Sequence, residues 1–405
     1  MQKDNSSLIR ESLWRLNGWV SKSSWVGYDP FDGLSAPFAR RLTFEIPILR
    51  IALQQSVRRL PFNIRPVLGI TRKHSNQAMG YFASGYLRLN AMPGRQDYLD
   101  RATYCLSDLQ ESYSRGYAGH AWGWAFDYQS RGHYLPQGVP TVVWTSFIGH
   151  SFVDAYELLA DNTYLAVARS ICSFILNDLP RHQITDHSLC ISYVPHMLLE
   201  IHNSNMLAAS LLARVYQHTG EPELVEIARR AIRYTMDHQR ADGSWYYGEG
   251  RRWHWVDGYH TGFVLDSLFW YMQATGDDQY APHLRRGMDY YRNHLFDGEM
   301  PKHYSNATYP IDIQAVAQAI QTFALIPPEY HGDLAWAERV AMWAIEHMQD
   351  PSGYFYFRKQ RFVTNKTAFL HWGQSTMLAA LTLFLQRKQA GKGLSPVREE
   401  VRKRT

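Results

Sequence analysis

The sequence contains little cysteine, and its cysteines are poorly placed for pairing. Cys105, Cys172 and Cys190 are an odd number, lie far apart and include no C-x-x-C pair. Such a set predicts neither a disulfide framework nor a thiolate zinc site. We therefore expect a protein of a reducing compartment.

Long apolar runs and a strong charge bias are also missing. No run approaches the roughly 18 to 20 apolar residues that a membrane span needs. The N-terminus MQKDNSSLIRESLWRLNGWV lacks the apolar core of a signal peptide. The net charge of +5 is too small to indicate a nucleic-acid partner. We expect a cytoplasmic protein without a membrane span, for which an acidic small molecule or glycan stays open as a ligand.

The histidines form no metal-binding motif. His196, His202, His254, His260 and His303 include no H-E-x-x-H and no i, i+4 pair on one helix. We predict no metal and no cofactor. A histidine that acts as a base remains open.

Aromatic residues, by contrast, are abundant: 13 Trp, 26 Tyr and 18 Phe make up 14% of the chain. Many must belong to the core, because aromatic side chains bury the most apolar surface per residue. A surplus in loops would instead indicate a stacking surface for a planar or sugar-like ligand.

Two markers repeat along the chain with nearly the same period. A turn of the T-G-D type recurs every 56 residues, at Gly220, Gly276 and Gly332. A glycine-centred loop recurs every 55 residues, at Gly243, Gly298 and Gly353. The stretches between them have apolar residues at i, i+3 and i+4, as in Leu224, Ile227, Ala228, Ala231 and Ile232. Helical hairpins that repeat in this way predict an all-α ring or solenoid.

The pattern predicts five hairpins, near residues 75–113, 145–178, 204–239, 261–294 and 312–349. Helices at 40–60 and 371–387 remain, and we expect them to pair and close a ring of six hairpins. Closure leaves no exposed apolar end, whereas an open solenoid needs capping repeats. The expected organisation is an N-terminal extension (1–39), an (α/α)6 toroid (40–387) and a flexible tail (388–405).

Three blocks carry a family resemblance that covers roughly residues 70–385: HQRADGSWYYGE, WHWVDGYHTGFVLDSL and PTVVWTSFIGHSFVDAYELLADNTYL. They resemble (α/α)6 toroid proteins of the six-hairpin glycosidase-like superfamily, namely bacterial and archaeal polysaccharide (exopolysaccharide) biosynthesis proteins. The resemblance implies the toroid and a role in carbohydrate metabolism. It does not select a reaction, because such toroids host glycoside hydrolases, polysaccharide lyases, sugar epimerases and, in related form, terpene cyclases.

In such toroids a cleft lies at the N-terminal ends of the inner helices. The loops that enter these helices run near 73–80, 120–144, 193–205, 245–262, 302–314 and 354–374. They carry the surplus aromatics mixed with polar groups, a combination suited to a sugar. We predict an oligo- or polysaccharide ligand, with these binding residues: Trp122, Trp124, Arg131, Tyr193, Trp245, Tyr247, Arg251, Trp253, Trp255, His303, Tyr304 and His371.

Carboxylates near the loop 245–262 suggest glycoside cleavage, in which one carboxyl protonates the leaving oxygen and another activates water or attacks. Asp257 is the first candidate, with Glu249 and Asp312 as partners and His260 as a possible base. Asp257 and Asp312 also stand where N-terminal helix caps are expected, so a purely structural role is the alternative.

Two further functions compete with glycoside cleavage. A uronate C5-epimerase or polysaccharide lyase would use a Tyr or His base and arginines, a set that Tyr246, Tyr259, His260, Arg251 and Arg131 supply. A non-catalytic glycan-binding or assembly factor in exopolysaccharide biosynthesis would keep the aromatic cleft without the catalytic groups.

Two acidic residues, Asp154 and Asp266, occupy equivalent repeat positions inside apolar inner helices. A carboxylate there must be paired or hydrogen-bonded, since burying it alone costs several kcal/mol or shifts its pKa. We expect these residues to tie neighbouring helices together, with a place on the cleft floor as the alternative.

Overall fold

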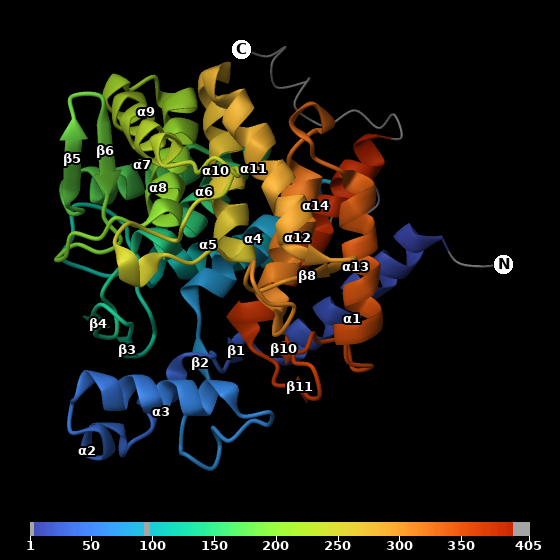
Figure 1. Cartoon of the computed structure of the whole chain (residues 1–405). Helices are drawn as coiled ribbons and strands as arrows, with labels where there is room; N and C mark the ends of the chain where they lie inside the picture. Colours follow the sequence, from blue (N-terminus) through green and yellow to red (C-terminus); the bar gives the residue numbers. More distant parts are fainter. Residues whose placement is uncertain (1–3, 93–97, 392–405) are drawn as a thin grey trace.

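A closed ring of helices forms most of the molecule (Figure 1). The computed structural model describes residues 4–92 and 98–391. The inner helices are α4 (Asn76–Asn90), α6 (Val142–Leu159), α8 (His202–Thr219), α10 (Gly258–Thr275), α12 (Ile313–Leu325) and α14 (Thr376–Ala390). Each packs against the next, and α14 packs against α4, so the ring closes. The predicted (α/α)6 toroid is confirmed.

Six outer helices surround the inner ones: α5 (Leu99–Glu111), α7 (Asn162–Asn177), α9 (Pro222–Asp237), α11 (Ala281–His294), α13 (Leu334–Met348) and α1 (Asn5–Lys22). Inner helices such as α8 are buried almost all round, whereas α9 buries one stripe, which includes the predicted Leu224 and Ile232. Gly220 and Gly276 end α8 and α10 with φ of 69° and 72°, a left-handed conformation that glycine adopts without strain.

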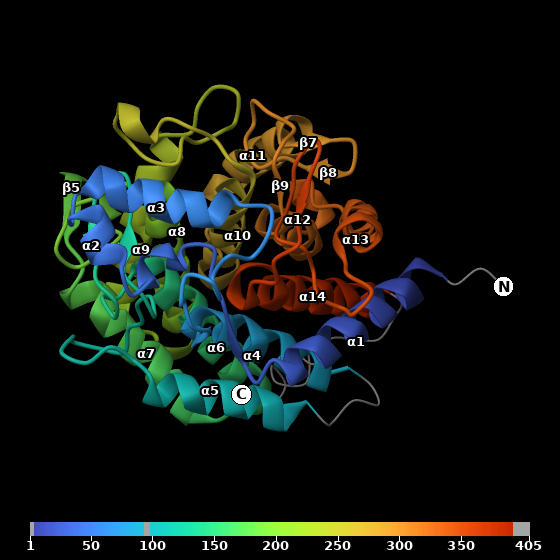
Figure 2. The ribbon, with the colours of Figure 1, turned by 90° about the horizontal axis from the view of Figure 1, so that it is seen from below.

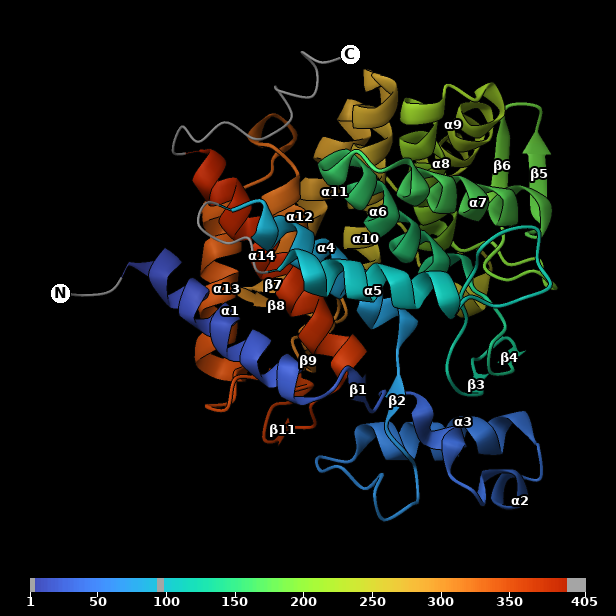
Figure 3. The ribbon, with the colours of Figure 1, turned by 180° about the vertical axis from the view of Figure 1, so that it is seen from behind.

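The closing hairpin differs from the expected one. We predicted that 40–60 would pair with 371–387, but α1 packs against α14 and α13 and completes the ring (Figure 3). The reason is burial: α1 buries Ile9, Leu13, Leu16 and Val20, an apolar stripe at helical spacing. The helix within 40–60 buries only Gln54 and Val57. The tail expected at 388–405 lies outside the described residues from 392 onward.

Residues 24–74, between α1 and α4, form a segment that we call the cap. It contains β1 (Val26–Gly27), η1 (Asp32–Ser35), α2 (Ala39–Thr43), α3 (Pro47–Arg59) and β2 (Lys73–His74). β1 and β2 pair at its base, and α3 packs on η1 and touches β3 of the ring. Seen from below, α3 lies across one end of the ring (Figure 2).

The remaining strands are short and lie in the loops between helices. They are β3 (Tyr128–Gln129), β4 (Tyr134–Leu135), β5 (Arg181–Thr185), β6 (Ser188–Ile191), β7 (Phe296–Asp297), β8 (Met300–Pro301), β9 (Ile311–Asp312), β10 (Arg358–Lys359) and β11 (Thr364–Asn365). All pairings are antiparallel: β3 with β4, β5 with β6, β7 with β8, and β10 with both β9 and β11. Short helices η2 (Arg251–Trp253), η3 (Asp278–Tyr280), η4 (Pro328–Tyr330) and η5 (Leu370–Ser375) complete the loops.

The two acidic residues inside inner helices link neighbouring helices, as predicted. Asp154 of α6 accepts hydrogen bonds from Arg214 of α8 (2.9 Å) and Arg88 of α4 (3.3 Å). Asp266 of α10 accepts one from Gln318 of α12 (2.8 Å). Among the described helices, none combines the length and the apolar character required to cross a bilayer.

Candidate functional site

A cavity of about 1210 Å³ lies where the inner helices begin and is bordered by residues of the cap. All six predicted loops contribute to its wall, through residues such as Gln77, Trp124, Tyr193, Tyr247 and His303. The cap adds Phe31 and Arg58 among others. The loops entering the inner helices therefore form a single site.

The wall of the cavity is rich in nitrogen-bearing side chains and lacks carboxylates. Its charged and imidazole groups are Arg58, Arg59, Arg131, Arg240, Arg358, Arg361, His133, His254, His260 and His303. Among the described residues that line it there is no Asp or Glu. The electrostatic character of the wall thus favours an electron-rich or anionic ligand.

The three carboxylates proposed for glycoside cleavage lie outside the lining. Asp257 and Asp312 cap α10 and α12, the positions that the structural alternative assigned to them. Both are buried, with exposed fractions of 3% and 0%. Glu249 accepts a hydrogen bond from the buried His202 Nε2 at 2.9 Å. All three carboxylates accept hydrogen bonds from other groups of the protein.

Asp257 instead positions His260, which does line the cavity. Asp257 Oδ2 is 2.7 Å from His260 Nδ1 and accepts a bond from Trp255 Nε1 at 2.9 Å. Burial opposes ionisation of Asp257, but the adjacent His260 and its hydrogen bonds hold the pKa of this carboxyl below its usual value. With the carboxylate as acceptor of the Nδ1 proton, Nε2 is the ring nitrogen that remains to accept a proton.

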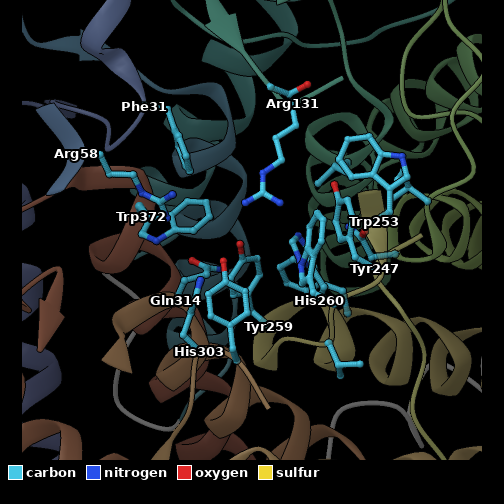
Figure 4. Close-up of a pocket in the computed structure, with 18 of the residues that line it drawn as sticks. Phe31, Arg58, Arg131, Tyr247, Trp253, Tyr259, His260, His303, Gln314 and Trp372 are labelled. Atoms are coloured by element: carbon cyan, nitrogen blue, oxygen red, sulfur yellow. The ribbon is translucent and has the colours of Figure 1, made fainter. Parts of the chain in front are cut away.

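Two tyrosines flank His260 (Figure 4). The rings of Tyr259 and Tyr247 lie 4.2 Å and 4.5 Å from the His260 ring, measured between centroids. Burial, followed by the charge of Asp257, raises the pKa of Tyr259 well above its usual value. Burial likewise raises the pKa of Tyr247. Both phenols are neutral near pH 7 and carry a proton that they can donate.

Most of the predicted sugar-binding residues meet in this cavity. Those that line it are Trp124, Arg131, Tyr193, Tyr247, Trp253, Trp255, His303 and Tyr304. Three others are committed elsewhere: Trp122 Nε1 donates to Leu109 O, Trp245 Nε1 donates to Thr235 O, and His371 Nδ1 pairs with Asp29. Arg251 lies exposed in η2, away from the lining.

The residues that the sequence did not reveal come from the cap and from the helix starts. Phe31 lies in the stretch 1–39 that was expected to be an N-terminal extension. Arg58 lies in 40–60, which was expected to be a helix of the ring. The sequence did contain one indication that this helix lies outside the ring: residues 47–59 have only a weak apolar stripe, which is atypical of a ring helix. Gln77, Asn203 and Gln314 stand in the first turns of inner helices, where polar residues in an apolar pattern hint at a lined cavity.

Several buried polar atoms of the wall have no hydrogen-bond partner among the described residues. They are Arg58 Nε, Gln77 Oε1, Trp124 Nε1, Gln129 Oε1, His133 Nε2, Asn203 Oδ1, His303 Nδ1, Gln314 Oε1 and Arg358 Nη2. Buried polar groups are nearly always satisfied, so donors and acceptors gathered around one cavity indicate a polar ligand.

No protein-family model and no curated protein matches this sequence. Solved structures do share its fold. A cellobiose 2-epimerase from Bacillus thermoamylovorans matches with a TM-score of 0.59 and 11% identity over 78% of this chain and 88% of that one. A GH76 alpha-mannanase from Bacteroides thetaiotaomicron matches with a TM-score of 0.55 and 16% identity over 78% of this chain and 86% of that one.

A structure titled as a polysaccharide lyase matches over more of this chain. Its TM-score is 0.59 and its identity 9%, and the match covers 96% of this chain and 99% of that one. At such identities the likeness shows the six-hairpin toroid fold.

Proposed function

We propose that this protein acts on a saccharide by removing a proton from a carbon next to a carbonyl or carboxylate group. The observation that carries the proposal is the His260–Asp257 pair, which opens on a cavity whose described lining has no carboxylate. Glycoside cleavage needs two carboxyl groups that reach the substrate. Proton abstraction needs a positioned base and donors that stabilise the developing negative charge, and the cavity has both.

Each group has a defined role in this chemistry. His260 Nε2 takes the proton from the carbon, and the electron pair of that bond forms an enolate. In an elimination, the pair then forms a carbon–carbon double bond while the bond to the glycosidic oxygen breaks. The Tyr259 phenol donates its proton to that oxygen. Asp257 stabilises the imidazolium and keeps its Nδ1 oriented.

The same first step leads to two outcomes. Elimination is the reaction of a lyase, and the nearly full-length likeness to a polysaccharide lyase supports it. Return of a proton to the opposite face of the carbon is epimerisation, and the sugar epimerases among the matched structures support that alternative. The resemblance of three sequence blocks to exopolysaccharide biosynthesis proteins favours a polymeric substrate.

The test is incubation with acidic and neutral oligosaccharides in deuterated water, followed by mass spectrometry and proton NMR. We expect either an unsaturated product or deuterium at the abstracted position. His260→Ala should lower the rate about 10²- to 10⁴-fold, the range for loss of a general base. His347→Ala, at an exposed histidine of α13, is the matched control and should leave the rate unchanged.

Chain shortening that yields saturated ends without deuterium would contradict the proposal and restore hydrolysis. Binding of a glycan without either change would favour the non-catalytic glycan-binding function.

A further inference from the structure

Among the described residues, Arg58 is a cation that forms no direct ion pair, and the carboxylate that acts on it, Asp312, is already bonded to Arg358. It stands in the last turn of α3, and its guanidinium lies 4.3 Å above the centre of the Phe31 ring. It points into the cavity from the cap side (Figure 4). Within residues 4–92 and 98–391 the guanidinium has no ion pair or hydrogen bond, and its Nε is buried and unpartnered.

A second arginine, Arg358, uses only some of its hydrogen-bond donors. Its Nε donates to Asp312 Oδ2 at 2.6 Å, while its Nη2 is buried without a partner. Asp312 Oδ1 already accepts bonds from Trp372 Nε1 and Gln314 N. Two guanidinium groups therefore share one carboxylate whose oxygens are occupied.

His303 adds an unpartnered imidazole nitrogen to the same region. Its Nδ1 is buried without a hydrogen bond, and it lines the cavity beside Tyr259, with ring centroids 5.5 Å apart. Burial, followed by the charge of Arg358, lowers the pKa of His303 to about 4, so the ring is neutral at pH 7. Neutral imidazole can donate one hydrogen bond to a ligand.

One carboxylate, Asp312, acts on the two arginines, so the group as a whole carries a net positive charge. Burial, and then the charge of Arg358, lowers the pKa of Arg58 to about 10, so Arg58 remains a cation at pH 7. A partly buried cation that has no ion pair of its own is costly, and a ligand that brings a negative charge would offset that cost. Planar guanidinium groups match the oxygens of a carboxylate or sulfate.

We propose that Arg58, Arg358 and His303 form a binding seat for an oxyanion on the substrate sugar, a carboxylate or a sulfate ester, so that this protein takes acidic saccharides. The sugar part of this inference rests on the proposed function; the anion part rests on the three side chains alone. A carboxylate held here has its charge neutralised, which makes the proton on the adjacent carbon easier to remove.

The test measures binding without turnover, in the His260→Ala background. The probes are glucuronate, galacturonate and mannuronate, with glucose 6-sulfate as the sulfate arm and glucose as the neutral reference, followed by calorimetry and ligand-observed NMR. At least one anionic sugar should bind more tightly than glucose. Adding Arg58→Met should weaken that binding about 30-fold or more, as truncation of a buried charged partner does. Arg41→Met, at an exposed arginine of the same cap, should change it less than twofold.

Whichever anionic sugar binds more tightly identifies the oxyanion. Thermal unfolding of Arg58→Met without ligand serves as a fold control: its melting temperature should not fall, because the substitution removes no ion pair and no hydrogen bond of the described residues. Anionic sugars that bind no better than glucose, or equally well to Arg58→Met, would overturn the seat. In that case turnover that still depends on His260 would leave the proposed function standing. Conversely, Arg58-dependent anion binding without any turnover would keep the seat and remove the reaction.

Discussion

The ring and the cap are built on different physical principles. The ring has a continuous apolar core that runs through all its helices, whereas the cap has a small one of Ala36, Ala39, Val57 and Ile70. The cap also exposes eight large apolar side chains: Phe38, Leu42, Phe44, Ile46, Ile48, Leu49, Phe62 and Val67. Burial stabilises the ring, and the cap must be held by something else.

Polar anchors hold the cap. Arg65, only 1% exposed, donates to Asp32 at 2.6 Å and to the carbonyl oxygen of Asp29 at 2.8 Å. Asp29 in turn pairs with His371 of the ring at 2.8 Å. A segment with a small core can therefore still place side chains, here Phe31 and Arg58, over a cavity that the ring provides.

The largest contrast should come from removing one aromatic ring in each region. Phe323 of α12 is 1% exposed and packs against Tyr291 and Phe296. Phe323→Ala should lower the free energy of unfolding by about 4 kcal/mol, through lost transfer energy and a cavity. Phe62→Ala in the cap, at 60% exposure, should change it by less than about 0.5 kcal/mol. Urea denaturation measures both; similar losses would erase the distinction.

Breaking the polar anchor should unfold the cap selectively. Arg65→Ala leaves Asp32 buried without its partner, at a cost of about 3 kcal/mol. Burial already raises the pKa of Asp32 to about 6 despite the charge of Arg65. Hydrogen exchange should show lost protection across 24–74 while the ring stays protected, and Arg41→Ala should have no such effect. Uniform loss across the whole chain would mean that cap and ring unfold together.

A third effect, no larger than that of the Arg65 substitution, concerns a polar group inside the ring, where burial is costly. Burial raises the pKa of Asp266 to about 6 from its usual 3.8. The folded state therefore binds this proton more tightly, so the contribution to stability is full below about pH 4 and is lost as pH rises through 6. Asp266→Asn should be more stable than the native protein at pH 8, by up to about 3 kcal/mol, with the gain vanishing toward pH 4. Denaturation midpoints across this range measure it, and a gain independent of pH would contradict the assignment.

Much of the ring was predictable because its signals are local. The glycine markers, the apolar stripe of α9 and the caps at Asp257 and Asp312 each depend on neighbours within a few turns of helix. The hairpins predicted at five places coincide with α4 to α13. The loops that form the cavity followed from knowing where the inner helices begin.

The partner of α14 was not predictable in the same way. Both 5–22 and 47–59 are helices, and choosing between them requires knowing which stripe meets the last inner helix in space. The roles within the site were hidden for a similar reason. Asp257 was a candidate both for catalysis and for a helix cap, and the structure places it as the cap of α10 and in contact with His260. Whether a capping carboxylate faces a cavity or a neighbouring ring depends on packing.

Sequence alone was sufficient for the repeat, the helix ends, the all-α toroid and the aromatic loops, since helix periodicity and capping act over short distances. Only the folded chain revealed the closing helix, the cap and the cavity wall without carboxylates. Those features depend on contacts between distant residues, such as His371 with Asp29 and Arg358 with Asp312 beside Arg58. Tertiary packing decides such contacts, because no local pattern specifies which side chains from different hairpins will share a cavity.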